Sequence, residues 1–290
     1  MPPALPPDLP EQVSRALRED IGPGDLTASL IDVATPARAH ILCREPALLC
    51  GCAWVEETFR QLDARVRIRW HAAEASAVAA NTILCELDGP ARALLTGERT
   101  ALNFLQLLSG TATATRAYVD AVAGTHCQIL DTRKTLPGLR TAQKYAVRCG
   151  GGSNHRIGLF DQILIKENHI AAAGSIAAAI RRARALHPGI KLEVETEDLA
   201  QLTEAIASGA DLIMLDEFSA EDQRRAVALV RSQAHPALLE VSGGVSLASV
   251  AAIAATGVDY ISVGALTKHV RAIDLSMRFE PAPLVGQAGN

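Results

Sequence analysis

The sequence is poor in aromatic residues, which make up 3% of its 290 positions. A close-packed interior must therefore be built mainly from Ala, Leu, Ile and Val. No apolar run reaches the roughly 18 residues that a membrane-spanning helix requires. The opening stretch MPPALPPDLPEQV has neither the basic start nor the apolar segment of a secretory signal. We therefore expect a cytoplasmic protein with no membrane partner.

An excess of positive charge is also missing. The chain has 28 Lys and Arg residues against 32 Asp and Glu residues, a net charge of −4. General binders of nucleic acid need a broad basic surface, so we expect no nucleic-acid partner. The hydrophobic content of 49% and the charged content of 21% are ordinary for a globular protein. The length suits one large α/β domain or two smaller ones.

The six cysteines contain no CxxC pair. Cys50-Gly-Cys52 is suggestive of a metal site, but no matching His/Cys pair lies nearby in the sequence. Four of the six lie in or beside apolar, strand-like runs, so we expect buried, reduced thiols. A GxGxxG turn is also missing after every predicted strand, which argues against a dinucleotide-binding sheet.

The first part of the chain predicts helices on one side of a mostly antiparallel sheet. Val13, Ala16 and Leu17 have helical spacing within residues 11–20. Short strands are predicted within 38–51, 64–72 and 81–89, with a helix over 53–62. A leucine stripe then predicts a helix over 91–110, ended by Gly110, and a second helix over 111–124.

From residue 127 onwards, apolar strands alternate with amphipathic helices. This rhythm is typical of βα units around a parallel sheet. The strands are predicted within 127–132, 161–166, 191–196, 211–216, 238–244 and 260–266, and the helices within 172–186, 196–209, 219–233 and 246–257. Polar residues mark the carboxyl ends of the strands: Asp131, Lys166, Glu195, Asp216, Ser242 and Gly264. Because active sites of β/α barrels lie at that face, we favour a barrel over an open sheet.

One segment concentrates the positive charge. Between Asp131 and Lys166 the basic residues are Arg133, Lys134, Arg140, Lys144, Arg148, Arg156 and Lys166, against the two acids Asp131 and Asp161. If the strands are barrel neighbours, some of these groups meet at one mouth: Arg133, Lys134, His155, Arg156 and Lys166. Arg binds carboxylates with two parallel hydrogen bonds, and Lys is a mobile point charge for phosphate. We expect a ligand with both kinds of anion; a solvated basic face is the alternative.

Two glycine-rich turns follow the last predicted strands, in VSGGVS and SVGAL. Backbone N–H groups in such turns, aided by a following helix, hold phosphate, although a tight turn without a ligand is the alternative. Glu195 and Asp216 end two earlier strands. They are candidates for binding hydroxyls or Mg²⁺, or structural counter-ions.

Arg99 is the only cation between Ala93 and Thr115. The side chain could extend from a core helix to solvent, or reach an anion across a subunit boundary.

These motifs together resemble the quinolinate phosphoribosyltransferase family, whose members are also called carboxylating nicotinate-nucleotide pyrophosphorylases. The likeness covers nearly the whole chain. It is carried by EDIGPGDLTA, GERTALNFLQLLSGTAT, DTRKTLPGLR, QKYAVRCGGGSNHRIGLFDQILIKENHI, EVE, IMLDEFS, EVSGGV and YISVGALTK. It implies an α/β protein with an irregular β/α barrel of the type II phosphoribosyltransferase kind. The implied domains are an N-terminal α/β sandwich over 1–109, the catalytic barrel over 110–268, and a segment over 269–290 that returns to the sandwich.

The resemblance implies a pentosyltransferase of NAD biosynthesis, a carboxylating nicotinate-nucleotide diphosphorylase. It would convert quinolinate and phosphoribosyl pyrophosphate to nicotinate mononucleotide, pyrophosphate and CO₂. A homo-oligomer, a dimer or a multiple of dimers up to a hexamer, is implied, with Arg99 of the partner subunit entering the site. Arg133, His155 and Arg156 would hold the two carboxylates together with that Arg99.

The resemblance assigns the remaining site residues to the phosphoribosyl side. Lys134 and Lys166 would face the pyrophosphate or the dicarboxylate. Glu195 and Asp216 would address the ribose hydroxyls and the cofactor Mg²⁺. The 5′-phosphate site and its surroundings would comprise Thr132, Ser242, Gly243, Gly244, Ser262 and Gly264.

Other functions remain open at this point. A related enzyme using another pyridine carboxylate would need fewer cations. A non-catalytic protein that binds a phosphorylated metabolite would need the glycine turns but neither Glu195 nor Asp216. A barrel aldolase or decarboxylase would form a Schiff base at Lys166. Hydrolase chemistry is disfavoured, because Ser153 and His155 have no evident third member of a triad.

Overall fold

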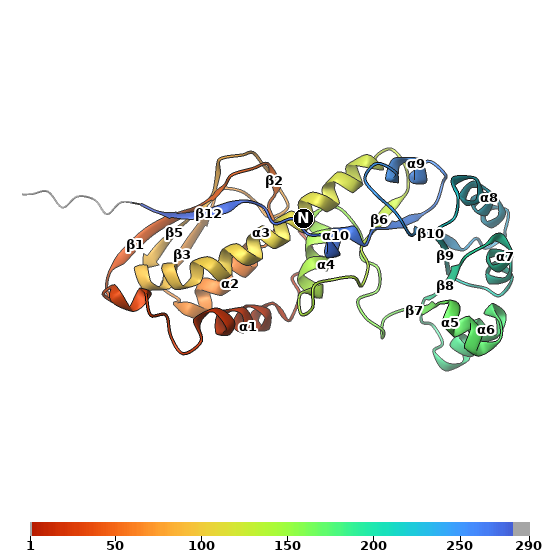
Figure 1. The fold of residues 1–290 in the computed structure, drawn as a ribbon, viewed down its shortest axis with the longest axis horizontal. Coiled ribbons are helices and arrows are strands. Elements are labelled where there is room, and N and C mark those ends of the chain that lie inside the picture. Colours follow the sequence, from red (N-terminus) through yellow and green to blue (C-terminus); the bar gives the residue numbers. More distant parts are fainter. Residues whose placement is uncertain (1, 281–290) are drawn as a thin grey trace, which may run out of the picture. The chain divides into compact units, whose positions relative to one another are not determined.

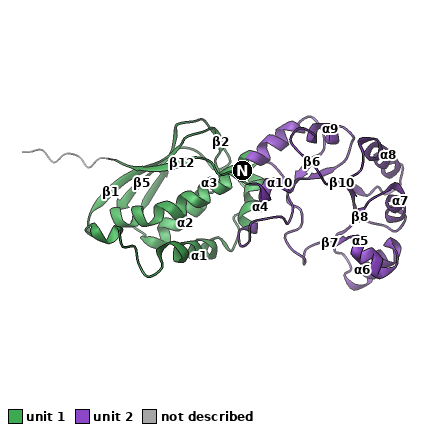
Figure 2. Cartoon of the chain, in the orientation of Figure 1, with its two compact units in different colours: residues 1–113, 141–150, 270–290 green, residues 114–140, 151–269 purple. Residues whose placement is uncertain are grey.

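The structure, a computed structural model, describes residues 2–280 (Figure 1). Two compact units divide the chain (Figure 2). As far as they are described, residues 1–113, 141–150 and 270–290 form unit 1, and residues 114–140 and 151–269 form unit 2. The domain boundaries predicted after residues 109 and 268 stay predictions; the compact units assign 141–150 to unit 1.

Unit 1 contains a four-stranded antiparallel sheet in the order β12-β1-β5-β3. Its strands are β1 (Pro36–Cys43), β3 (Arg67–Trp70), β5 (Thr82–Pro90) and β12 (Leu275–Phe279). Strand β12 pairs with β1 in a register that sets Met277 opposite Ile41. The C-terminal segment therefore completes the N-terminal sheet, as the resemblance implied. A two-stranded sheet joins β2 (Ala47–Leu48) to β4 (Ala77–Val78).

Helices α2 (Cys52–Leu62) and α3 (Ala91–Ala121) pack against one face of this sheet. Unit 1 also contains α1 (Leu9–Ile21), α4 (Arg140–Cys149) and a short 3₁₀ turn over Ala28–Leu30. Strand β1 alternates half-buried and buried side chains along its second half, as expected for a sheet with one covered face. Its buried residues Ala39 and Ile41 belong to one cluster with Phe59 of α2 and with Leu94 and Leu102 of α3.

Gly110 does not end a helix, contrary to the prediction. Helix α3 is continuous from Ala91 to Ala121. A Cβ atom on Gly110 would lie 2.2 Å from the carbonyl oxygen of Arg271. Glycine is required here because another segment of backbone passes against the helix, and not because the chain must turn.

Unit 2 is built on six parallel strands in the order β6-β11-β10-β9-β8-β7. The strands are β6 (Gln128–Leu130), β7 (Ile163–Ile165), β8 (Leu192–Thr196), β9 (Leu212–Asp216), β10 (Leu238–Ser242) and β11 (Tyr260–Ser262). Each lies within a segment predicted as a strand. Strand β6, the first of these in the sequence, pairs with β11, the last, and β6 and β7 are the two edges of the sheet as described. At the opposite edge of β6, Ser153 forms a parallel bridge with Leu130, so an irregular segment extends the ring.

The helices of unit 2 are α5 (Glu167–Ala173), α6 (Ile176–Leu186), α7 (Leu199–Ala207), α8 (Ala220–Arg231), α9 (Val250–Ala254) and α10 (Ala265–Lys268). Helices α5 to α8 lie on the outer side of the strands (Figure 1). Ser175, Asp198 and Ser219 cap three of them by accepting backbone N–H bonds. Parallel pairing brings the carboxyl ends of all six strands to one face of the barrel.

The six cysteines all lie in the described part, and each is free and buried, as predicted. None of the helices described is both long and apolar enough to span a membrane.

Candidate functional site

A cavity of about 480 Å³ opens at the carboxyl ends of the strands of unit 2. The predicted site residues that line it are Thr132, Arg133, Lys134, His155, Arg156, Lys166, Glu195, Asp216, Ser242, Gly243, Gly244 and Ser262. The cavity is also lined by four residues that the sequence did not predict: Leu164, Met214, Glu217 and Glu240. The basic groups and the glycine turn therefore share one cavity.

Arg133 and Arg156 bring two positive charges together in this cavity. Burial lowers the pKa of Arg156, and the charge of Arg133 lowers it further. The Nε atom of Arg133 is buried and has no hydrogen-bond partner among residues 2–280. A pair of guanidinium groups that repel each other in a concave site is suited to a ligand with more than one negative charge.

Asp131 positions the loop that carries Arg156. Its carboxylate is fully buried and accepts hydrogen bonds from Asn154 Nδ2 at 2.6 Å and from the backbone N–H of His155 at 2.9 Å. Asp161 accepts two further backbone bonds, from Ile157 and Gly158. The sequence signal for Asp131 was its place at the end of an apolar strand, but its partners could not be identified without the fold.

The ring of His155 is enclosed by protein groups. Its Nδ1 accepts a hydrogen bond from the backbone N–H of Arg156 at 2.7 Å. Its Nε2 lies 3.0 Å from Glu193 Oε2 and 3.5 Å from Glu240 Oε2. These approaches are within ion-pair distance but are not aligned as hydrogen bonds. The predicted contact of His155 with a substrate carboxylate stays a prediction.

Glu193 and Glu240 were not predicted as site residues. Both side chains are fully buried, on β8 and β10. Burial raises the pKa of each carboxyl group, and the negative charge of Glu193 raises the pKa of Glu240 further. The sequence feature that could have indicated these two residues is a glutamate inside each of two apolar strands, in KLEVET and LLEVSGG.

One part of the cavity lining contains two acids, Glu195 and Asp216, together with the basic residue Lys166. The Nζ of Lys166 bonds to Glu195 Oε2. Burial raises the pKa of Glu195, the bond to Lys166 opposes this shift, and the charge of Asp216 reinforces it. Asp216 lies opposite Ser242 in the register of β9 and β10. Glu195 pairs with Met214 in the register of β8 and β9, two residues before Asp216, so the two carboxylates lie at neighbouring strand ends.

Gly243 has a backbone conformation that suits glycine alone. Its φ is +90°, and a Cβ there would lie 2.8 Å from Glu217 Cγ and 3.3 Å from Asp216 Oδ1. Gly244 has a φ of +55° with open space around it. The helix predicted from residue 246 begins only at Val250, so the turn offers backbone N–H groups without a helix directly behind them.

Lys134 and Gly264 are neighbours at the other side of the mouth. Lys134 is exposed, and its backbone is fixed by Thr132 Oγ1, which accepts its N–H, and by Thr267 Oγ1, which donates to its carbonyl. Gly264 does not itself line the cavity, but a Cβ there would lie 3.1 Å from Lys134 Cδ. Glycine at this position leaves room for the lysine stem.

The remaining basic residues of the segment do not line the cavity. Arg140 donates to the carbonyl of Ile157, and Lys144 is buried in helix α4 of unit 1. Arg99 lies exposed on α3 within unit 1. Its entry into a partner's site stays a prediction.

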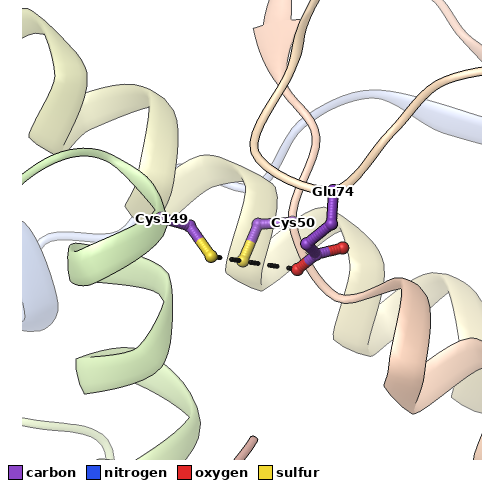
Figure 3. A group of neighbouring side chains, drawn as sticks. All are labelled: Cys50, Glu74 and Cys149. Carbon is purple, nitrogen blue, oxygen red and sulfur yellow. Dashed lines mark hydrogen bonds between the residues drawn. The ribbon is translucent and has the colours of Figure 1, made fainter. Parts of the chain in front are cut away.

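A second cluster of reactive groups lies in unit 1, where the fold brings Cys149 beside Cys50 and Glu74 (Figure 3). The sequence offered no partner for Cys50. Glu74 accepts the backbone N–H bonds of Gly51 and Cys52 at 2.9 and 3.0 Å, and thereby caps helix α2. Cys149 Sγ donates to the same carboxylate at 3.9 Å, and burial raises the pKa of Cys50. These contacts give the carboxylate a structural role.

Comparisons with known proteins agree with the resemblance seen in the motifs. Residues 25–109 match the N-terminal domain and residues 111–278 the C-terminal domain of quinolinate phosphoribosyl transferase. A probable nicotinate-nucleotide pyrophosphorylase [carboxylating] of Bacillus subtilis is 45% identical over 260 residues, 89% of either chain. The human nicotinate-nucleotide pyrophosphorylase [carboxylating] is 37% identical over 287 residues, 97% of this chain and 96% of that protein.

A solved structure gives the same answer. The nicotinate-nucleotide pyrophosphorylase from Francisella tularensis superimposes with a TM-score of 0.91 at 49% identity, covering 96% of this chain and 98% of that one. The fold is therefore the predicted irregular β/α barrel with an α/β sandwich completed by the C-terminal segment. On the strength of both matched domains and these relatives, the chain belongs to the quinolinate phosphoribosyltransferase family.

Proposed function

We propose that this protein transfers the phosphoribosyl group of phosphoribosyl pyrophosphate to the ring nitrogen of quinolinate. The products are nicotinate mononucleotide, pyrophosphate and CO₂, in the de novo synthesis of NAD. The observation that carries the proposal is the Arg133–Arg156 pair, which shares one cavity with the Lys166–Glu195 pair and the glycine turn. A ligand pair with a dicarboxylate and a phosphorylated sugar satisfies all of these groups.

The dicarboxylate is assigned to the two guanidinium groups. Each carboxylate of quinolinate can accept parallel hydrogen bonds from Arg133 or Arg156, and its charge relieves their mutual repulsion. Arg99 of the partner subunit completes this set in our proposal, which makes the protein a homodimer or a multiple of dimers. A cytoplasmic location is consistent with the free thiols.

The phosphoribosyl group is assigned to the opposite side of the cavity. Backbone N–H groups of Gly243 and Gly244 suit the 5′-phosphate, and Lys134 suits the pyrophosphate. Two carboxylates on adjacent strand ends, each an oxygen donor, fit the requirements of Mg²⁺, so Glu195 and Asp216 would hold it beside the ribose hydroxyls. When bound, Mg²⁺ supplies positive charge for the leaving pyrophosphate.

The chain's own residues act by position and charge. Lys134 and Lys166 stabilise the negative charge that develops as the bond between the sugar and pyrophosphate breaks. The arginine pair holds the pyridine so that its nitrogen faces the sugar carbon, and such alignment lowers a barrier by roughly 7–11 kcal/mol in ideal cases. The ring nitrogen becomes cationic, so the electron pair left on carbon by departing CO₂ is stabilised next to it, and a proton from solvent then completes the C–H bond of the product. A nucleophilic residue is not needed, and Ser153 instead donates its hydroxyl to Gln128.

A product assay tests this proposal. Purified protein is mixed with both substrates, with and without Mg²⁺, using quinolinate labelled at its 2-carboxylate. We expect nicotinate mononucleotide and one equivalent of labelled CO₂, and no product when Mg²⁺ is removed. The exposed Arg224→Ala variant, on α8, is the matched control and should keep full activity. Equal turnover of nicotinate by the unsubstituted protein would contradict the dicarboxylate assignment.

A further inference from the structure

Two acids lie under the floor of the cavity. The side chains of Glu193 and Glu240 are 0% exposed, and that of His155, which lies against them, is 7% exposed. Burial raises the pKa of both carboxyl groups and so favours their protonated forms, and polar groups at such depth need partners because an unpartnered one is unfavourable. None of the direct substrate contacts assigned above requires them.

The hydrogen bond at Nδ1 fixes the state of the His155 ring. Nδ1 accepts the backbone N–H of Arg156 at 2.7 Å, so it carries no proton. The proton of the neutral ring is then on Nε2, which faces Glu193 at 3.0 Å and Glu240 at 3.5 Å. His155 therefore links the two buried acids on one side to the backbone of Arg156 on the other.

Glu193 also reaches Arg156 by a second route. Gln162 donates its side-chain Nε2–H to Glu193 Oε2 at 2.7 Å, and Arg156 Nη1 donates to the backbone carbonyl of Gln162 at 3.5 Å. The negative charge of Glu193 acts on the Arg156 guanidinium in addition, opposite in sign to the effect of Arg133. Both ends of Arg156, its backbone and its side chain, are therefore connected to the same buried carboxylate.

From this arrangement we propose that Glu193 and Glu240 are positioning residues for dicarboxylate binding. Through the His155 ring and Gln162, they hold Arg156 in the place where its guanidinium meets a carboxylate of the pyridine substrate. Neither is assigned a direct substrate contact, although Glu240 lines the cavity. The inference rests on the proposed function for the identity of that substrate.

The side chains of His155, Glu193 and Glu240 bring possible ligand atoms within 4.8 Å of one another, so they could be interpreted as a metal site. The hydrogen bond at Nδ1 argues against it. A neutral imidazole that accepts at Nδ1 carries its proton on Nε2, the atom that faces the carboxylates, and a protonated nitrogen cannot ligate a cation. A positioning role is compatible with a ring that accepts a hydrogen bond at Nδ1 and carries its proton on Nε2.

The test compares two substitutions at one position. Glu193→Leu replaces the carboxyl group by an apolar branch of roughly similar size, so it removes the acceptor of the Gln162 hydrogen bond and the acidic group that faces His155 Nε2, whereas Glu193→Gln keeps one carbonyl acceptor. We expect E193L to raise KM for quinolinate about tenfold or more, with KM for phosphoribosyl pyrophosphate within about twofold of the unsubstituted value. E193Q should recover most of the loss. A merely structural role would reduce the active fraction without separating the two KM values or the two variants.

A second measurement does not depend on the Glu193 variants. In the unsubstituted protein with nitrogen-15-labelled histidine, the His155 signal, assigned by its loss in His155→Asn, should show a bare Nδ1 and a protonated Nε2. A proton on Nδ1, or equal KM effects for E193L and E193Q, would overturn the inference. If the unsubstituted protein forms no nicotinate mononucleotide, the proposed function fails, while the histidine spectrum still tests the link to Arg156.

Discussion

Arg133 and Arg156 illustrate a residue-scale compromise between stability and binding. Their like charges lie close enough that Arg133 depresses the pKa of Arg156. This electrostatic repulsion is unfavourable in the free protein and is relieved when a dianion binds. Residues arranged for function in this way often cost some stability, so their removal need not weaken the fold.

The Arg133→Ala variant tests this compromise. We expect kcat/KM for quinolinate to fall by about two orders of magnitude or more, since a charge-assisted pair in a concave site is lost. The thermal midpoint should stay unchanged or rise slightly, because Arg156 loses a like-charged neighbour. Steady-state kinetics and thermal denaturation measure the two quantities on one preparation. A loss of activity in proportion to a loss of stability would argue against the assignment.

The buried acid Glu240 predicts how stability depends on pH. Its pKa is raised by burial from 4.5 to about 8. Below pH 4.5 the group is protonated in both states, and between pH 4.5 and about 8 only the folded protein keeps the proton. The free energy of unfolding therefore falls as pH rises through this window, by at most about 1.4 kcal/mol per pH unit for one such group.

Glu240→Gln should flatten that slope, because an amide does not titrate. Urea denaturation followed by circular dichroism at several pH values between 5 and 8 measures it. Tryptophan fluorescence is unsuitable, because Trp54 and Trp70 both lie in unit 1, whereas Glu240 lies in unit 2. An unchanged slope in E240Q would mean that this carboxyl group does not hold its proton as its burial indicates.

At the scale of elements, helix α3 shows how a single glycine can be misread. The sequence contains a leucine stripe followed by Gly110, which is the pattern of a helix stop. The helix continues because Gly110 contacts the backbone at Arg271, a segment more than 150 residues away in the sequence. The spacing of the leucines correctly predicts that this segment is helical. It does not reveal that the backbone of a segment distant in the sequence will pack against Gly110.

Gly110→Ala and Gly97→Ala form a matched pair within α3. At Gly110 the added Cβ would lie 2.2 Å from a backbone oxygen, while at Gly97 it would meet side-chain atoms of Phe59 and Leu62, which can move. Alanine gains about 1 kcal/mol of helix propensity at either position. We expect G110A to destabilise unit 1 by roughly 1–3 kcal/mol or more, and by more than G97A. Denaturation followed by tryptophan fluorescence compares them, and a larger loss for G97A would contradict this account.

At the scale of the whole molecule, the strand-ending polar residues were the most informative part of the sequence. Asp216 and Ser242 were predicted from their place after apolar strands, and parallel pairing does bring them side by side. The link from Glu193 and Glu240 to His155 could not be predicted. Those glutamates occupy mid-strand positions, and only the closure of the barrel decides which side chains meet inside it. The same limit applies to Cys149 beside Cys50, which join segments about 100 residues apart.

The assembly can be tested by mixing two inactive variants. If Arg99 of the partner subunit enters the site, Arg99→Ala and Arg133→Ala damage sites by residues from different subunits. Dissociating and remixing equal amounts should then restore about one quarter of the unsubstituted activity, since half the dimers are hybrids with one intact site each. Mixing Arg133→Ala with Arg156→Ala, both within unit 2 of one chain, should restore none. Equal recovery in both mixtures would contradict the shared site.

The central claim is that the cavity of unit 2 is built for a pyridine with two carboxylates. Titration calorimetry of the unsubstituted protein with quinolinate, and separately with nicotinate, measures this most directly. We predict binding of quinolinate that is at least tenfold tighter than that of nicotinate, since one charge-assisted contact contributes about 1.5–3 kcal/mol. Equal affinity for the two acids would contradict the account.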